Sequence, residues 1–150
     1  LIPQDNPVDI VYQMPLNKTP INADLNQTEL NMGIDIKLNF DNNDLEVKNN
    51  DFKLIAGVDN LIQATKMKLS VDKGELKYHT NYGLGIEVGE KITSYTATSL
   101  YDEINAAILS DDRVESIKNM DIAYENNSLI INLMIKAKEA NEPVPIFMKF

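Results

Sequence analysis

The sequence predicts an α+β fold, in which strands and helices occupy separate stretches of the chain. Apolar and polar residues alternate over residues 34–54 and again over 114–137, which is the period of a half-buried strand. Between these stretches, apolar residues recur every three or four positions, as in an amphipathic helix. The predicted order is an N-terminal β-hairpin, two amphipathic helices separated by a turn-rich loop, and a C-terminal antiparallel meander. No internal repeat is visible.

The predicted hairpin begins with the alternating residues 34–40 and resumes from Leu45 to Leu54. Between them, Asp41-Asn42-Asn43-Asp44 supplies turn chemistry, because Asn and Asp side chains bond the local backbone and tolerate left-handed angles. The acidic residues here resemble a calcium loop only faintly, since the Gly that an EF-hand loop needs at its sixth position is missing. We therefore expect a turn and no metal.

Two amphipathic helices are expected in the middle of the chain. The first follows Gly57 and ends near Gly74, where a left-handed glycine would stop it. The second spans roughly residues 98–109, with Ser99 and Asp102 at the spacing of a capping box. The apolar faces consist of Val58, Leu61, Ile62, Thr65, Met67 and Leu69 in the first helix, and Leu100, Ile104, Ala107 and Ile108 in the second.

The C-terminal part predicts three strands. Residues 114–124 form the first, and Glu125-Asn126-Asn127-Ser128 forms a hairpin turn. Residues 129–137 are apolar on both sides, which is typical of a central strand. The last strand, within residues 143–150, belongs at an edge because Pro143 and Pro145 cannot donate to a ladder.

Residues 1–32 show no sustained period and contain four prolines, so we expect an extended arm. The arm is too apolar for a solvated linker, and we expect it to lie on its own body or on a neighbour. Residues 33–150 form the folded domain. No signal peptide is visible. Because the chain opens at Leu1 without Met, we expect an upstream segment to be removed or left out of this sequence.

Composition limits the classes of function. A net charge of −9 argues against nucleic acid and against an anionic membrane surface, both of which bind clustered Lys and Arg. The chain has no Cys, which excludes disulfides, thiolate zinc sites and Cys nucleophiles, and its single His79 excludes a His-rich metal site. No apolar run reaches 18 residues. We predict no metal and no cofactor.

A series of short motifs runs through the middle of the chain. Asp51-Phe52 is followed by Gly57-Val-Asp-Asn-Leu-Ile-Gln63, Gly74-Glu75 and Tyr82-Gly83, and Asp111-Asp112-Arg113-Val114 follows the second helix. Over about residues 33–137, this order resembles the baseplate wedge or sheath-initiator family of contractile phage tails and related injection systems, also called lysozyme-like. Gly74-Glu75-Leu76-Lys77 replaces the Glu-Pro-Arg turn of secretion-system members. That departure favours the phage-tail branch and leaves the Arg contacts of that turn without a counterpart.

The resemblance implies a structural protein of the virion tail baseplate, made in the host cytoplasm and present in several copies around the tail axis. Its partners would be other wedge proteins and the tail sheath, whose subunits exchange strands, a form of β-augmentation. The arm is a candidate for wrapping a wedge partner. The candidate docking edge is the last strand, with Val144, Ile146, Phe147 and Met148. We expect a chain lacking residues 143–150 to fold but not to support sheath assembly.

Other residues of the motifs receive structural or interface roles. Gly74 would stop the first helix, and Glu75 would accept loop N–H groups or pair with a basic residue of a partner. Tyr82 would pack against the first helix, while Gly83 allows a tight turn. Arg113 would form a salt bridge or bond local carbonyls.

Two rival functions come from other classes. One is a peptidoglycan hydrolase with Glu75 as its acid, which needs a second carboxylate and a cleft. The chain has no Trp to stack on sugars, so we predict that it is not an enzyme. A zymogram with Glu75→Gln as control separates the two. The other rival is a tail-assembly binding module of a non-contractile phage. A sheath gene close to this one would favour the baseplate interpretation, and its absence would weaken it.

Overall fold

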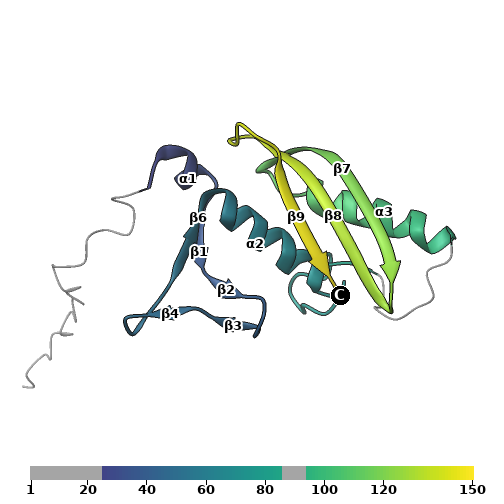
Figure 1. Cartoon of the computed structure of the whole chain (residues 1–150), viewed down its shortest axis with the longest axis horizontal. Coiled ribbons are helices and arrows are strands. Elements are labelled where there is room, and N and C mark those ends of the chain that lie inside the picture. Colours follow the sequence, from purple (N-terminus) through teal and green to yellow (C-terminus); the bar gives the residue numbers. More distant parts are fainter. Residues whose placement is uncertain (1–24, 86–93) are drawn as a thin grey trace, which may run out of the picture.

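The computed structural model describes residues 25–85 and 94–150, and it confirms the α+β class (Figure 1). Helix α2 runs between a small β module on one side and a three-stranded sheet on the other. The elements are α1 (Gln27–Asn31), β1 (Ile34–Ile36), β2 (Leu38–Asn39), β3 (Asp44–Leu45), β4 (Val47–Lys48), β5 (Asp51–Phe52), β6 (Leu54–Ala56), α2 (Gly57–Ser70), α3 (Ser94–Leu109), β7 (Val114–Glu125), β8 (Ser128–Ala137) and β9 (Val144–Lys149).

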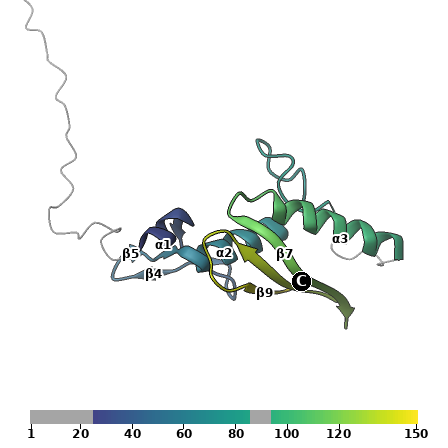
Figure 2. The same ribbon diagram turned by 90° about the horizontal axis from the view of Figure 1, so that it is seen from above.

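The C-terminal sheet has the antiparallel order β7-β8-β9, which confirms that β8 is central and β9 lies at an edge. Asn126 and Asn127 both have positive φ, 49° and 64°, as the two-residue turn of a tight hairpin requires. Helix α3 covers one face of the sheet (Figure 2). Helix α2 packs against both α3 and β9.

The hydrophobic core lies between this sheet and the two long helices. Leu61 of α2, Ile104 of α3 and Ile131 of β8 are fully buried. Helix α3 uses its predicted face, since Leu100, Ile104 and Ile108 are all buried. Replacing water around each such side chain with protein stabilises the fold by about 1.5–3 kcal/mol before entropy is subtracted.

Several helix ends differ from the prediction. Helix α2 ends at Ser70 and Val71 is already extended, so the prediction that Gly74 stops the helix is wrong. Helix α3 begins at Ser94, which places Ser99 inside the helix and not at its cap. Residues 27–31, assigned to the arm, form a short helix whose capping box pairs Asn26 with Glu29. Residues 1–24, the rest of the arm, lie outside the described residues.

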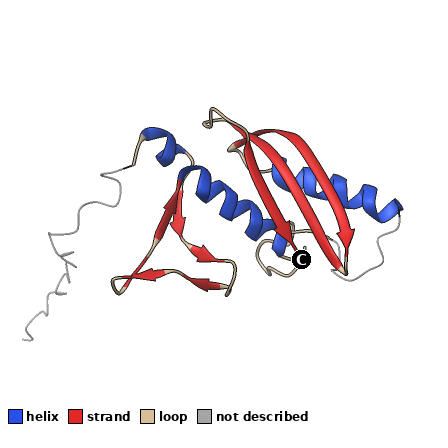
Figure 3. Cartoon of the chain, viewed as in Figure 1, coloured by secondary structure: helices blue, strands red, loops and turns tan. Residues whose placement is uncertain are grey.

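The predicted hairpin is branched into three short ladders, which lie at the corners of a triangular outline (Figure 3). Strand β1 pairs with β6, β2 with β3, and β4 with β5. At the junction the Lys37 N–H donates to Lys53 O (2.7 Å), the Lys53 N–H to Glu46 O (2.8 Å), and the Glu46 N–H to Lys37 O (2.9 Å). This closed ring of bonds joins the ladders. We call residues 34–56 the plate.

The two faces of the plate differ in polarity. On one face, Glu46 forms salt bridges with Lys37 (3.0 Å) and Lys53 (3.1 Å). Strand residues alternate between faces, so the neighbours of these three residues point the other way. We call that side the apolar face; it is formed by Ile36, Leu38, Leu45, Val47, Phe52 and Leu54. The predicted half-burial is wrong for the tips, because Phe40, Leu45, Val47 and Phe52 are exposed.

Candidate docking surfaces

Strand β9 presents an open main-chain edge. Leu129 and Phe150 exchange both of their N–H···O bonds, at 3.1 and 2.9 Å. Because bonded and non-bonded pairs alternate in an antiparallel ladder, the main-chain groups of residues 144, 146 and 148 also point toward β8. Those of Pro145, Phe147 and Lys149 point away from the sheet. Pro145 therefore sits where a missing N–H costs no ladder bond.

The side chains of β9 divide between the core and the surface. Val144 and Ile146 are 2% exposed and Met148 is 7% exposed, so all three belong to the hydrophobic core. Phe147 is 55% exposed on the opposite face of the sheet. Of the four side chains that the sequence assigned to docking on β9, only Phe147 is free to contact a partner.

Phe147 borders an open groove on the face of the sheet that α3 does not cover. The register aligns Asn119, Met134 and Pro145 in one row, and Asp121, Asn132 and Phe147 in the next. Met134 is 36% exposed, so this face is partly apolar. The groove is lined by Asn119, Asn132, Leu133, Met134, Pro145, Ile146 and Phe147.

The loop after α2 folds back on the end of that helix. The Leu84 N–H donates to Val71 O (2.9 Å), and the Lys73 N–H donates to Leu84 O (2.7 Å). Tyr82 is half-buried, and Lys68 of α2 places its ammonium 5.5 Å from the centre of the ring. Burial raises the pKa of the Tyr82 hydroxyl, and the charge of Asp111 adds to that shift.

Gly74 and Gly83 occupy different environments in this loop, although both have positive φ, +93° and +101°. A Cβ at Gly83 would overlap the carbonyl oxygen of Val71, whereas a Cβ at Gly74 would meet nothing within 4 Å. Glu75 follows Gly74 on an exposed turn, where its Oε2 accepts the Asp72 N–H at 3.2 Å.

We expect Gly83→Ala to destabilise the protein by about 2 kcal/mol more than Gly74→Ala. Both substitutions carry the backbone strain of an L residue at positive φ, so the difference between them isolates the clash with Val71. Urea unfolding of the two variants measures that difference. Equal losses of stability would show that the loop moves away from Val71 at no cost.

A polar clamp of Asn60, Gln63 and Arg113 holds the plate to the body. Arg113 Nη1 donates to the carbonyl oxygen of Met32 at 2.8 Å, and Asn60 Nδ2 donates to the same oxygen at 3.2 Å. Gln63 spans the β1–β2 step: its Nε2 donates to Ile36 O (2.8 Å), while its Oε1 accepts the N–H of residue 38 (2.9 Å). Asn60 and Gln63 are buried, and these bonds give each of the two amide groups a main-chain partner.

Arg113 is itself held by Asp111. Its Nε and Nη2 donate to the two carboxylate oxygens, at 2.9 and 2.6 Å. These hydrogen bonds lower the pKa of Asp111 against the opposing effect of burial. The same bonds raise the pKa of Arg113. Arg113 thus forms the expected salt bridge, but the carbonyl that it bonds belongs to Met32, 81 positions away in the sequence, and is not the local one that was predicted.

The described residues contain no group of metal-ligating side chains, and they place Glu75 on the surface. Within residues 25–85 and 94–150, no three His, Cys, Asp or Glu side chains are grouped to hold a metal ion. Glycoside hydrolysis needs an acid in a cleft with a second carboxylate facing it across the substrate. Glu75 instead lies on an exposed turn.

Comparison with known proteins identifies the family. Residues 34–140 match the model of the contractile injection system sheath initiator. The chain belongs to that family. The match includes the plate, the polar clamp and the first two strands of the sheet, and it ends before β9. No curated protein matches the chain.

Solved structures share the fold. One is the crystal structure of a "putative tail lysozyme" from Geobacter sulfurreducens, which is 19% identical, with a TM-score of 0.53. The similarity covers 61% of this sheath-initiator family member and 87% of the other chain. At this identity it shows the fold alone. Among the described helices, none combines the length and hydropathy needed to cross a bilayer.

Proposed function

We propose that this protein is a non-enzymatic component of a contractile tail baseplate and templates sheath assembly by pairing strands along β9. Its membership of the sheath initiator family supports a role in a contractile injection system. The observation that carries the finer proposal is the β9 edge, where the main-chain groups of Pro145, Phe147 and Lys149 point away from the sheet. An incoming strand would form hydrogen bonds with these groups and contact the exposed ring of Phe147.

In the same proposal, the protein docks to wedge proteins in several copies around the tail axis, within the virion. Each copy then presents one β9 edge to the first ring of sheath. The net charge of −9 favours neighbours with basic surfaces, since complementary charge speeds association and disfavours wrong partners. The expected wrapping of a wedge partner by the arm falls on residues outside those described.

The sharpest test replaces Phe147 with proline. Because the Phe147 N–H points away from β8, Phe147→Pro removes a docking bond and no ladder bond of this domain. Phe147→Val is the matched control, since it removes the ring but keeps the N–H.

We expect electron micrographs of Phe147→Pro baseplates to show at most about a tenth of the wild-type number of sheathed tails. A tenfold drop corresponds to the loss of about 1.4 kcal/mol of binding free energy between β9 and the incoming strand. The Val control should retain most of them, and both isolated variants should melt near the wild type. Normal sheath assembly on Phe147→Pro baseplates would exclude β9 as the docking edge.

A further inference from the structure

Strand β7 forms the second edge of the C-terminal sheet, opposite β9. It has 12 residues, whereas β9 has 6. A long edge strand presents a row of unpaired N–H and C=O groups, with which another chain can pair. Pairing of this kind between copies of the chain would compete with the proposed pairing at β9. The contacts along β7 therefore bear on which partners the sheet accepts.

The first half of β7 is irregular. Its register with β8 shifts between Val114 and Ser116 and again between Ile117 and Asn119. Each shift leaves one extra residue on β7, as in a β-bulge, and the two extra residues, at positions 115 and 118, are exposed and charged. Bulges and charged side chains both interrupt the regular row of groups that a foreign strand needs. A second chain therefore cannot pair continuously with this half.

The second half of β7 pairs with β8 without a shift. Leu129 of β8 exchanges both of its main-chain bonds with Phe150. Its partner across the hairpin, Tyr124, therefore points its N–H and C=O away from β8, and alternation gives Ile122 and Met120 the same direction. Three residues with outward groups would match the three on β9, so the sheet would have two equal edges if nothing else contacted them.

Helix α3 occupies this edge at Met120. The Tyr101 hydroxyl donates a hydrogen bond to the carbonyl oxygen of Met120. Tyr101 is 43% exposed, so its ring lies at the surface and not in the core. In Figure 1, α3 crosses behind β7 and extends past its outer side. The hydroxyl thus takes the acceptor that a partner strand would need at Met120, and two of the three outward residues are left.

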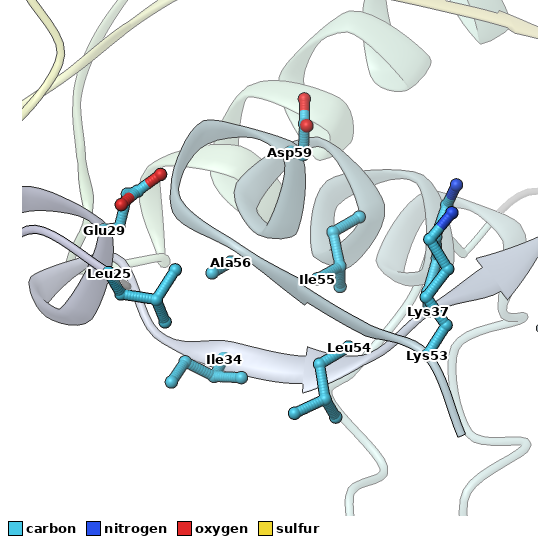
Figure 4. Close-up of a pocket in the computed structure, with 9 residues that line it drawn as sticks. All are labelled: Leu25, Glu29, Ile34, Lys37, Lys53, Leu54, Ile55, Ala56 and Asp59. Carbon is cyan, nitrogen blue, oxygen red and sulfur yellow. The ribbon is translucent and has the colours of Figure 1, made fainter. Parts of the chain in front are cut away.

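The plate shows the same arrangement at another strand. Strands β1 and β6 lie alongside α2 (Figure 4). From α2, Gln63 donates to Ile36 O and accepts the N–H of residue 38, so a helix side chain again bonds main-chain groups that the ladder leaves unpaired. Among the contacts of the described residues, none reaches the outward main-chain groups of β9. The two edges of the sheet therefore differ.

We propose that Tyr101 closes the β7 edge to strand pairing and so keeps copies of this chain from joining through their sheets. The strand that it excludes belongs to a second copy. An edge that pairs head-to-tail with the edge of the next copy builds chains that do not close into a ring of fixed size. The consequence, that a strand adds to this sheet at β9 alone, rests on the proposed function, whereas the closure of β7 does not.

Sedimentation of the full-length protein over a range of concentrations tests the proposal. Tyr101→Ala removes the hydroxyl and the ring, and we expect it to raise the constant for self-association at least about tenfold. Tyr101→Phe removes the hydroxyl alone and keeps the packing of the ring, so its constant should rise less, and it remains informative if the Ala variant loses its fold. Tyr78→Ala is the matched control. It removes another exposed tyrosine, in the loop after α2, and should sediment like the wild type.

A second substitution locates the association. Ile122→Pro removes an outward N–H and no ladder bond, so in the Tyr101→Ala background it should return self-association to the wild-type level. Wild-type sedimentation of both Tyr101 variants would overturn the proposal. Association that survives Ile122→Pro would overturn it too, because the contact would then lie elsewhere. No sheath is present in these measurements, so their failure is distinct from normal sheath assembly on Phe147→Pro baseplates.

Discussion

Deletion of residues 143–150 is expected to unfold the domain. The deletion removes Val144, Ile146 and Met148, which are 2%, 2% and 7% exposed, from the core. Each contributes about 1.5–3 kcal/mol by burial, and their sum approaches the 5–15 kcal/mol that typically stabilises a whole domain. The central strand β8 also loses its ladder with β9. The expectation from sequence, that a chain without this strand still folds, does not fit this burial.

Circular dichroism and thermal melting of the purified truncation measure the effect. The control is a full-length triple variant, Pro145→Ala, Phe147→Ala and Lys149→Ala, which removes outward side chains and keeps the inward ones. We expect the control to melt cooperatively near the wild-type temperature and the truncation to show no cooperative transition. A truncation that melts like the wild type would mean that β9 contributes little to folding.

Arg113→Ala is expected to destabilise the protein by about 2–3 kcal/mol. The substitution removes the guanidinium that binds both carboxylate oxygens of Asp111. It also removes one of the hydrogen bonds that the carbonyl oxygen of the buried residue Met32 accepts. Arg113→Lys should recover little of the loss, because an ammonium cannot bond Asp111 and Met32 with the geometry of a guanidinium. Urea unfolding of the three proteins at neutral pH provides the comparison.

The loss of stability caused by Arg113→Ala should become smaller as the pH falls. Arg113 lowers the pKa of Asp111 in the folded protein, so the stability from this pair is fully present above the ordinary carboxyl pKa of about 4. It is lost as the pH falls through the lowered pKa, because protonation ends the charge pairing. The stability difference between wild type and Arg113→Ala should therefore shrink in acid. Asn60→Ala is the control; it removes an uncharged donor to Met32, and its effect should change less with pH.

Much of the fold could be predicted because its patterns are local. The apolar faces of residues 57–70 and 98–109 follow the helical period, and the Asn126-Asn127 turn supplies the angles that a tight hairpin needs. The branching of residues 34–56 could not be predicted in this way. Alternation continues through Lys37, Glu46 and Lys53 whether these residues lie in one hairpin or at the meeting point of three ladders. Only the bonds among them, between residues far apart in sequence, distinguish the two arrangements.

The docking residues were predicted less well than the strand that carries them. Val144, Ile146 and Met148 occupy alternate positions, so strand geometry alone places them on one face and Phe147 on the other. Asn60 and Gln63 lie within the Gly57-to-Gln63 motif, but the sequence pattern assigns them no role. The available signal was a pair of amides, three residues apart, on an otherwise amphipathic helix. Their partners are carbonyl and N–H groups of residues 32–38, which no pattern within the helix reveals.

The closed ring of bonds at Lys37, Glu46 and Lys53 separates the corners of the plate from its centre. Each corner, at residues 40–43 and 49–50, is a turn that lies beyond the ring. Lengthening a surface turn costs only about 0.6 kcal/mol per doubling of its length. Phe40, in the first corner, lines a groove with Gln63 of the polar clamp, whereas Asn49 and Asn50, in the second, are exposed. The second corner is therefore the better place to insert an epitope tag or a fluorescent label that reports where the molecule sits in an assembled particle.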